Sequence, residues 1–438
     1  MGKKRNDQTT IKEQIKVNDG ESIFPNFLYY TFGYGISIVF GLAFAIYLRD
    51  LHEVTLFFSN IRKIEQEISL RTESGLYYSY FKEILQKPTI ALGIQALLND
   101  TRTEYPRAIN ILERFNVYQE VLLAILYRAY DFNLAPMLFY VYWCFAFAGL
   151  QVFAIFHLSW TLSKSVAFPV LACSWLFYNL DETTRAYFSV NLRENFSLPF
   201  LFLQTVFLCQ LLIKQKNFMA CGVGYVMAIL ASHVLYKGKK LIGLSNAKVL
   251  AIAIAFSLLY AQYGVYKEQM TNEQEFFDED TVDLMLWIGW QRRDAVFTGS
   301  MQLMAGVKAC TGRNILNHPH FEDQWIRNRT KRLYSIYGRK SIKRVHQILK
   351  KEKADFVIIE DSICLAPSTG CSTNDLVDFA SGLLPDNGLT KFGKNLKEKI
   401  SEERFCEAIR SPDPSLERYF ILEHSNPTFR VYKINHDD

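Results

Sequence analysis

Six long apolar runs interrupt the first 266 residues of this chain of 438 residues. They cover residues 24–48, 135–162, 166–180, 196–213, 218–236 and 247–266. A helix needs roughly 20 apolar residues to cross a bilayer, and lipid accepts only segments that satisfy their own backbone hydrogen bonds. The runs therefore predict a polytopic α-helical membrane protein. The first run starts too late and is too long for a typical cleaved signal peptide, so we expect it to remain as a helix.

The rest of the chain divides by composition. We expect a basic tail at 1–23, a membrane domain at 24–266 that includes a polar loop at 49–134, and a soluble domain at 267–438. Helix and strand signals alternate in the soluble domain, which predicts an α/β fold. The predicted elements are strands at 294–299 and 355–360, helices at 300–310 and 341–350, and a hairpin of 419–423 with 429–434.

Basic loops give the orientation, because Lys and Arg concentrate on the cytosolic side. The N-terminal tail is then cytosolic and loop 49–134 is lumenal. Lysines flank the run at 218–236 on both sides, at 214, 216, 237, 239 and 240. One crossing helix cannot join two cytosolic loops. Five crossings place 267–438 in the lumen and six place it in the cytosol. We prefer five, because the sequons at Asn99, Asn195 and Asn328 are then all lumenal glycosylation candidates.

Charge and cysteine content exclude several function classes. The net charge of +5 is dispersed, and the aromatic residues lie inside apolar runs, so nucleic-acid binding is not expected. No spacing of Cys and His is typical of a zinc site. Cys364 and Cys371 close a short loop, which predicts a disulfide in an oxidising lumen; two free thiols are the alternative.

The most informative motif is RTESGLYYSYFKEI at residues 71–84, directly after the first membrane helix and polar linker. A carboxylate at Glu73 can act as a base or bind a sugar hydroxyl, and the guanidinium of Arg71 can hold an anion bidentately. Tyrosines such as Tyr77 offer flat, partly polar surface beside a membrane. A solvated helix start with interfacial aromatics is the alternative interpretation.

This motif resembles the hallmark of the Dumpy-type protein C-mannosyltransferases. The resemblance continues through DETTR at 181–185, LRENFS at 192–197, FTGSMQL at 297–303, CTGR at 310–313, NHPHFED at 317–323 and EDSIC at 360–364. These segments follow one another in order along the chain. Together they are specific for the family.

The resemblance implies a glycosyltransferase of the GT-C type in the endoplasmic reticulum membrane, with the nuclear envelope as an alternative location. Such an enzyme transfers mannose from dolichol-phosphate-mannose to C2 of tryptophan. Its acceptors are unfolded secretory proteins with W-x-x-W or W-x-x-C motifs, such as thrombospondin-type repeats. The resemblance implies no metal and no cofactor beyond the lipid-linked donor, and membrane lipid is the surrounding partner.

Site roles follow from this chemistry. Glu73 is the expected catalytic base, since a carboxylate can stabilise a cationic transition state and then accept the C2 proton. Arg71 is expected to orient Glu73 or to bind the phosphate of the donor. Arg185 is expected to neutralise the charge of the leaving dolichyl phosphate. Asp181 and Glu182 are candidate mannose ligands, with a plain interfacial ion-pair group as the alternative.

Two histidines, His318 and His320, flank Pro319 beside two acidic residues. The residue types would suit a metal, but a loop of solvated or hydrogen-bonded histidines is the more ordinary arrangement. We assign both to substrate binding as a hypothesis.

Relatives of this type are longer, and here the region from 214 to 222 runs directly into a later helix. The sequence therefore indicates a shortened member that lacks several central helices. A non-catalytic membrane scaffold or anchor derived from the family is the main alternative. A transporter would want ionisable groups at midplane depth, and the apolar runs contain no paired carboxylates.

Overall fold

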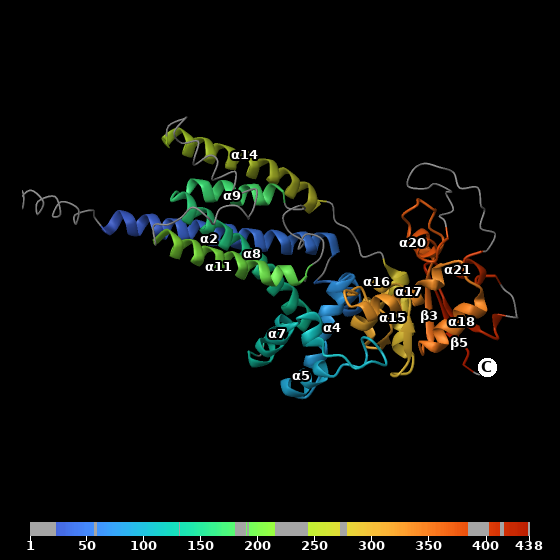
Figure 1. The fold of residues 1–438 in the computed structure, drawn as a ribbon. Helices are drawn as coiled ribbons and strands as arrows, with labels where there is room; N and C mark the ends of the chain where they lie inside the picture. The colour runs from blue at the N-terminus through green and yellow to red at the C-terminus, as the bar shows by residue number, and fades with distance from the viewer. Residues whose placement is uncertain are drawn as a thin grey trace, which may run out of the picture. The chain divides into compact units, whose positions relative to one another are not determined.

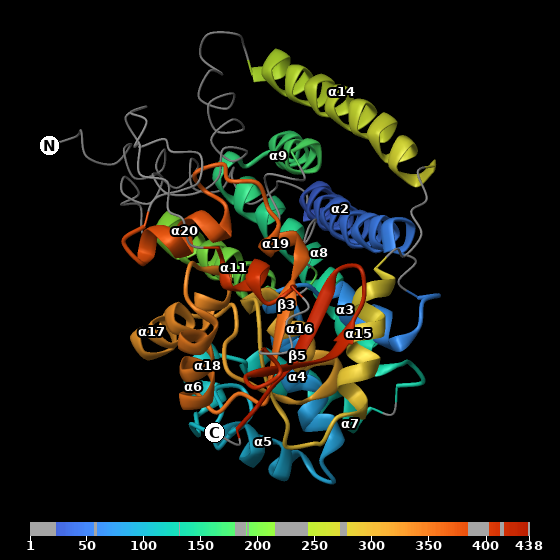
Figure 2. The ribbon, with the colours of Figure 1, turned by 90° about the vertical axis from the view of Figure 1, so that its right-hand side faces the viewer.

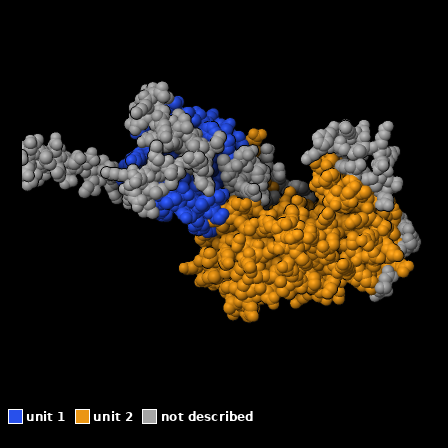
Figure 3. Space-filling view, viewed as in Figure 1, with its two compact units in different colours: residues 1–47, 146–183, 197–267 blue, residues 48–145, 184–196, 268–438 orange. Residues whose placement is uncertain are grey.

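The computed structural model describes residues 23–56, 59–130, 132–179, 190, 192–214, 244–271, 278–383, 403–411 and 416–436. The chain divides into two compact units (Figure 3). Unit 1 comprises residues 1–47, 146–183 and 197–267, and unit 2 comprises residues 48–145, 184–196 and 268–438. This division differs from the predicted one, because loop 49–134 belongs with the C-terminal segment and not with the membrane helices.

Unit 1 is built from apolar helices (Figure 1). They are α2 (Ile23–Leu56), α8 (Pro136–Ser163), α9 (Ala167–Tyr178), α11 (Arg193–Lys214) and α14 (Leu244–Thr271). The ends of α2, α8, α11 and α14 extend into unit 2. Five of the six predicted apolar runs are thus confirmed as helices, and the run at 218–236 lies outside the described residues.

Three of these helices are long and apolar enough to cross a membrane: Leu28–Thr55, Pro136–Ser163 and Ala247–Thr271. α9 has 12 residues, about 18 Å of helix, which is shorter than the roughly 30 Å hydrocarbon core. The number of crossings stays a prediction.

Small residues set the approach of α2 to α8. A Cβ added at Gly149 would lie 2.5 Å from the carbonyl oxygen of Gly41, and one added at Gly41 would lie 2.9 Å from the carbonyl oxygen of Gly149. Backbones can come this close only where both residues lack side chains, which is a common device for packing helices in lipid. Nearer the start of α2, the side chain of Trp160 packs directly against Gly33 and leaves no space for a Cβ there.

Unit 2 contains a five-stranded mixed sheet with the strand order β2-β1-β3-β5-β4. The strands are β1 (Val296–Thr298), β2 (Asn314–Ile315), β3 (Phe356–Glu360), β4 (Phe420–Ser425) and β5 (Phe429–Ile434). β1 pairs in parallel with β2 and β3, and β5 pairs antiparallel with β3 and β4. The predicted strands and hairpin are confirmed, whereas the short β2 gave no sequence signal.

Helices cover both faces of this sheet (Figure 2). One face carries α17 (Gln324–Leu333), the 3₁₀ helix η2 (Tyr334–Tyr337), α18 (Ile342–Lys351) and α21 (Phe405–Ala408). The other carries α3 (Lys63–Ser69), α15 (Glu279–Trp290) and α16 (Met301–Thr311). Side chains alternate along a strand; in β3, Val357 and Ile359 enter the first core while Phe356 and Ile358 enter the second.

The loop between the first two apolar helices completes unit 2. Its helices are α3, α4 (Glu73–Gln86), α5 (Ile90–Leu98), α6 (Ile111–Phe115) and α7 (Tyr118–Ala129). α4 packs against α16, where the ammonium group of Lys82 donates to the carbonyl oxygen of Ala309. Most of the motif at 71–84 is therefore a buried helix of the α/β unit, while its start at Arg71 and Glu73 remains accessible.

The predicted Cys364–Cys371 disulfide is wrong. Cys364, at the end of α19 (Asp361–Cys364), pairs with Cys406 in α21, 42 positions further along the chain, with a Cα–Cα distance of 5.9 Å. Cys371 is exposed and free. It precedes α20 (Thr373–Ala380), and the loop ahead of that helix is closed instead by hydrogen bonds from residues 368–370 to the Asp375 carboxylate.

Candidate active site around Tyr77

A strained turn places Glu73 in the first turn of α4. Thr72 has φ 53° and ψ −127°, a region that β-branched residues rarely adopt. At Gly75 an added Cβ would lie 2.5 Å from the Leu70 carbonyl oxygen. The glycine of the RTESG motif is thus required by a close backbone approach. Arg71 is exposed and Glu73 is half-buried, so both polar groups remain accessible beside a buried helix.

One turn further along α4, Tyr77 is 1% exposed, and its hydroxyl has no hydrogen-bond partner within the described residues. Burial raises the pKa of Tyr77, and so do the carboxylates of Glu73, Glu120 and Glu322, while Arg193 acts in the opposite direction. Ionisable groups of both signs therefore act on one hydroxyl that has no hydrogen-bond partner in the described part of the chain. Buried polar groups without partners are rare in proteins, so this hydroxyl is a candidate ligand-binding group.

Arg193, Glu322 and His320 complete a ring of side chains with Tyr77. The Arg193 guanidinium carbon lies 5.7 Å from the Tyr77 ring centroid, and its Nη2 lies 3.7 Å from Glu322 Oε1. Glu322 Oε2 lies 2.6 Å from His320 Nδ1, and the His320 and Tyr77 rings are 6.3 Å apart. The start of α11, the loop before α17 and α4 supply these groups.

His320 is a neutral imidazole at physiological pH. Burial and the cations Arg193 and Arg114 lower its pKa to about 3. Glu104 acts against this, whereas the Glu322 carboxylate in contact with His320 is 74% exposed and screened by water. We assign the Nδ1–H as donor to Glu322. Nε2 is then an unprotonated acceptor, and it is buried without a partner, as a substrate N–H or O–H would require.

His318 has a structural contact instead. Its Nε2 lies 3.3 Å from Glu104 Oε1, and both side chains are fully buried. Arg114 also reaches Glu104, at 3.2 Å. Burial lowers the pKa of His318 despite the neighbouring carboxylate. Phe115 packs against both histidine rings, so His318 orders the loop from which His320 extends.

Glu120 on α7 is a buried carboxyl that sequence patterns did not reveal. It is fully buried, and Tyr140 donates to its Oε1 at 2.9 Å. Burial raises its pKa to about 8, so the group is mostly protonated at neutral pH. A neutral carboxyl near Tyr77 can donate a hydrogen bond where an ionised one cannot.

The sequence-predicted residues divide into three groups. Glu73, Tyr77 and His320 are brought together, and His318 holds the loop that carries His320 through its contacts with Glu104 and Phe115. Asp181, Glu182 and Arg185 lie outside the described residues. Asn99 and Asn328 are exposed, as glycosylation requires. Asn195 is 3% exposed and donates to the Val190 carbonyl oxygen, a placement that does not suit an accessible acceptor.

Two further motifs meet elsewhere in unit 2. Ser300, from FTGSMQL, donates to the carboxylate of Glu360, from EDSIC, at the adjacent carboxyl ends of β1 and β3. Burial raises the pKa of Glu360. Both residues line a cavity of about 1130 Å³. Ligands of open α/β sheets commonly bind at such a point, where the connections leave in opposite directions.

Within the described residues, no group of three or more His, Cys, Asp or Glu side chains is placed so that it could hold a metal ion. In the sequence, Arg193 is only part of a matched motif, and Glu322 is considered only as one of two acidic residues that could suit a metal beside the histidines. Their role is visible only once the start of α11 and the 317–323 loop are seen to meet at α4.

These features define a membrane-anchored α/β protein with a carboxylate-rich site. The Dpy19 family model, described as Q-cell neuroblast polarisation, matches residues 38–237 and 216–434. The chain therefore belongs to the Dpy19 family. The two matches meet at 216–237, the region where basic loops gave a conflicting topology.

Curated relatives carry names that state an activity. A human protein named Probable C-mannosyltransferase DPY19L4 is 22% identical over 682 residues, covering 94% of this chain and 93% of that protein. The human Protein C-mannosyl-transferase DPY19L1 is 34% identical over 43% of this chain and 32% of its own length. The Caenorhabditis elegans C-mannosyltransferase dpy-19 is 34% identical over 37% of this chain and 28% of its own length. The first alignment is longer than this chain, so it contains interior gaps, as expected for a shortened member.

Proposed function

We propose that this chain is a protein C-mannosyltransferase. It transfers mannose from dolichol-phosphate-mannose to C2 of tryptophan in W-x-x-W or W-x-x-C motifs of unfolded secretory proteins. The observation that carries the proposal is the ring of Tyr77, Arg193, Glu322 and His320. Glu73 lies one turn before Tyr77 on α4. The ring occurs in a family whose curated relatives are named for this activity.

During the reaction, positive charge develops at mannosyl C1 and negative charge on the leaving phosphate. Indole C2 bonds to mannosyl C1 while the bond from C1 to the phosphate oxygen breaks, and dolichyl phosphate leaves with the electron pair. Glu73 stabilises the positive charge that develops at C1 and then accepts the proton from indole C2. Arg71 and Arg193 are accessible guanidiniums that match phosphate geometry, and Arg185 keeps its predicted place in this role. His320 Nε2 can accept a hydrogen bond from the indole N–H or a mannose hydroxyl.

The proposed location is the endoplasmic reticulum membrane, where the chain is a GT-C-like polytopic protein whose C-terminal α/β domain is lumenal. The nuclear envelope is the alternative location. Disulfides persist in oxidising compartments, so the Cys364–Cys406 bond supports a lumenal unit 2. The exposed sequons at Asn99 and Asn328 agree with this placement.

A non-catalytic scaffold is the second candidate. The gaps in the alignment to the human relative favour it, because missing helices would remove part of a lipid-donor groove. Binding of dolichol-phosphate-mannose by the purified full chain separates the two proposals, since a scaffold without the groove has no reason to bind the donor.

The test is mannose transfer from dolichol-phosphate-mannose to a W-x-x-W peptide, read by mass spectrometry. Loss of a general base slows turnover by about 10²–10⁴-fold, so we expect Glu73→Gln to do the same without affecting folding. Glu113→Gln is the control, because Glu113 is an exposed acid in the same loop. Undiminished transfer by Glu73→Gln makes another carboxylate the base. No transfer by a folded wild type favours the scaffold.

A further inference from the structure

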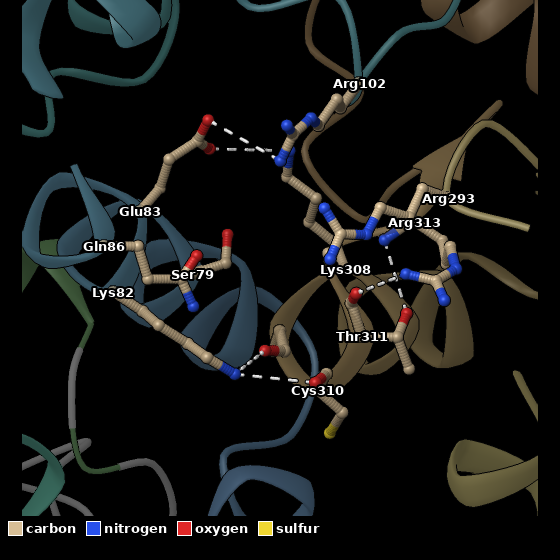
Figure 4. A pocket seen from close by; sticks show the side chains of 12 residues that line it. Ser79, Lys82, Glu83, Gln86, Arg102, Arg293, Lys308, Cys310, Thr311 and Arg313 are labelled. Atoms are coloured by element: carbon tan, nitrogen blue, oxygen red, sulfur yellow. Dashed lines mark hydrogen bonds and ion pairs between the residues drawn. The ribbon is translucent and has the colours of Figure 1, made fainter. Parts of the chain in front are cut away.

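Figure 4 shows a second polar cavity in unit 2, and none of Tyr77, Arg193, His320 and Glu322 lines it. It measures about 340 Å³ and is lined by the C-terminal halves of α4 and α16, the segment before β1 and the loop at Arg102. Its charged lining is one carboxylate and five cations: Glu83, Lys82, Arg102, Arg293, Lys308 and Arg313. The volume falls in the range of roughly 300–1,000 Å³ that small-molecule sites occupy.

The two lysines are already compensated. Lys82 Nζ lies 2.7 Å from Glu67 Oε1. Lys308 is almost fully buried, and its Nζ lies 3.5 Å from Asp100 and 3.8 Å from Glu83. These distances exceed those of a hydrogen-bonded ion pair, and Lys308 Nζ has no hydrogen-bond partner within the described residues. The three carboxylates balance the lysines and leave at most one charge for the arginines.

The three arginines lack such partners. Arg102 reaches Glu83 only at 4.0 Å. Arg313 donates to the neutral carbonyl oxygens of Thr311, Gly289 and Gln291, and its Nε is buried without a partner. Arg293 is exposed and makes no hydrogen bond or ion pair within the described residues. Figure 4 shows the three side chains facing the same space.

The mutual approach of these guanidiniums costs free energy. Burial lowers the pKa of Arg313, and Arg293 and Arg102 lower it further. Part of this cluster has a structural role, since Lys82 and Arg313 satisfy carbonyl groups at the C-terminus of α16. That role does not explain Arg293, which adds a cation to two others without meeting an acceptor.

We propose that this cavity binds an oxyanion of the phosphate class, with Arg293, Arg102 and Lys308 as its ligands. Guanidinium groups present paired donors that fit phosphate oxygens, and the buried ammonium of Lys308 supplies a further donor. The phosphate can belong to a free phosphate ester or to a lipid headgroup. The inference does not depend on mannosyl transfer.

The experiment measures binding to the purified full chain in detergent at low ionic strength. Inorganic pyrophosphate is the free probe, and vesicles of phosphatidylcholine with or without phosphatidic acid are the lipid probe. A ligand that binds only the folded state raises the melting temperature. We expect a dose-dependent rise with pyrophosphate, or selective binding to vesicles with phosphatidic acid, according to the source of the phosphate.

Arg293→Gln should weaken binding about tenfold or more, as expected when a charge-assisted hydrogen-bonding group is lost. Arg292→Gln is the matched control, because Arg292 is the neighbouring exposed arginine, lies beside Asp294 and Asp355, and does not line this cavity. Equal losses in both variants, or no response of the wild type to either probe, overturns the proposal.

Discussion

The two units differ in which side chains they expose and which they bury. α14 of unit 1 leaves its apolar side chains outward, with Phe256 68% and Tyr260 81% exposed. Unit 2 instead buries charged groups such as Glu104, Arg329 and Asp378 within ion-pair networks. Exposed apolar surface is stable in lipid, whereas buried charge is stable only when it is paired.

This difference explains why the polar loop at 49–134 was assigned to the wrong unit from sequence order. The loop is flanked by apolar helices, but its own charged side chains must either face water or pair with other charged groups. Glu67 illustrates this: it is buried and reaches Lys82, within the layer where α4 packs against α16. Compatibility with solvent, and not proximity in the chain, decides which segments fold together.

The largest expected effect concerns the covalent bond of unit 2. Cys406→Ser removes the link to Cys364, and a closed loop of 42 residues is worth about 4 kcal/mol of unfolding free energy. Denaturant unfolding of the purified chain, followed by a probe in unit 2, measures the loss. Cys371→Ser is the control, since that thiol is exposed and free. A loss from Cys371→Ser with none from Cys406→Ser would argue for the Cys364–Cys371 pairing.

A pH effect also belongs to unit 2. The pKa of Glu120 is raised from its ordinary value of 4.5 to about 8, so the folded state binds the extra proton. Stability from this group is present at low pH and is lost as pH rises through about 8. Relative to Glu120→Gln, the wild type should lose on the order of 3 kcal/mol between pH 5 and 8. Parallel pH profiles of unfolding for the two proteins would show that Glu120 is ionised throughout.

Glu120 also marks the limit of sequence reasoning. Long apolar runs, the β3 strand and the hairpin were predictable, because periodicity and β-branched residues act locally. The RTE motif was recognisable from its letters. The ring of Tyr77, Arg193, Glu322 and His320 was not, because its members come from three distant segments. The Cys364–Cys406 pair was missed for the same reason: short spacing favoured Cys371, while the partner depends on how α21 packs.

A smaller effect tests unit 1. Gly149→Ala places a Cβ against the Gly41 carbonyl oxygen, so α2 and α8 must separate, and overpacking of this kind costs about 1–3 kcal/mol. Gly35→Ala, also in α2, meets nothing within 4 Å and should be neutral or slightly stabilising. Thermal unfolding in detergent, read from helix content, compares the two. If Gly149→Ala is as harmless as Gly35→Ala, close packing is not what holds these helices.

The smallest effect compares two residues that share a positive φ, one in each unit. Thr72 in unit 2 and Lys164 in unit 1 each have φ 53°, where glycine is unstrained. Relief of strain is worth about 1–3 kcal/mol, and the greater freedom of glycine when unfolded offsets up to about 1 kcal/mol. Both Thr72→Gly and Lys164→Gly should therefore be neutral to mildly stabilising in thermal unfolding.

Activity should separate the two variants. Thr72 lies between Arg71 and Glu73, and its conformation determines how Glu73 enters α4, whereas Lys164 lies in the turn between α8 and α9. A glycine at 72 lets Glu73 sample other positions, so mannose transfer should fall several-fold while Lys164→Gly retains it. Equal transfer by both variants would mean that the strain at Thr72 serves only the packing of Gly75 against Leu70, and that Glu73 is positioned by its neighbours in unit 2 alone.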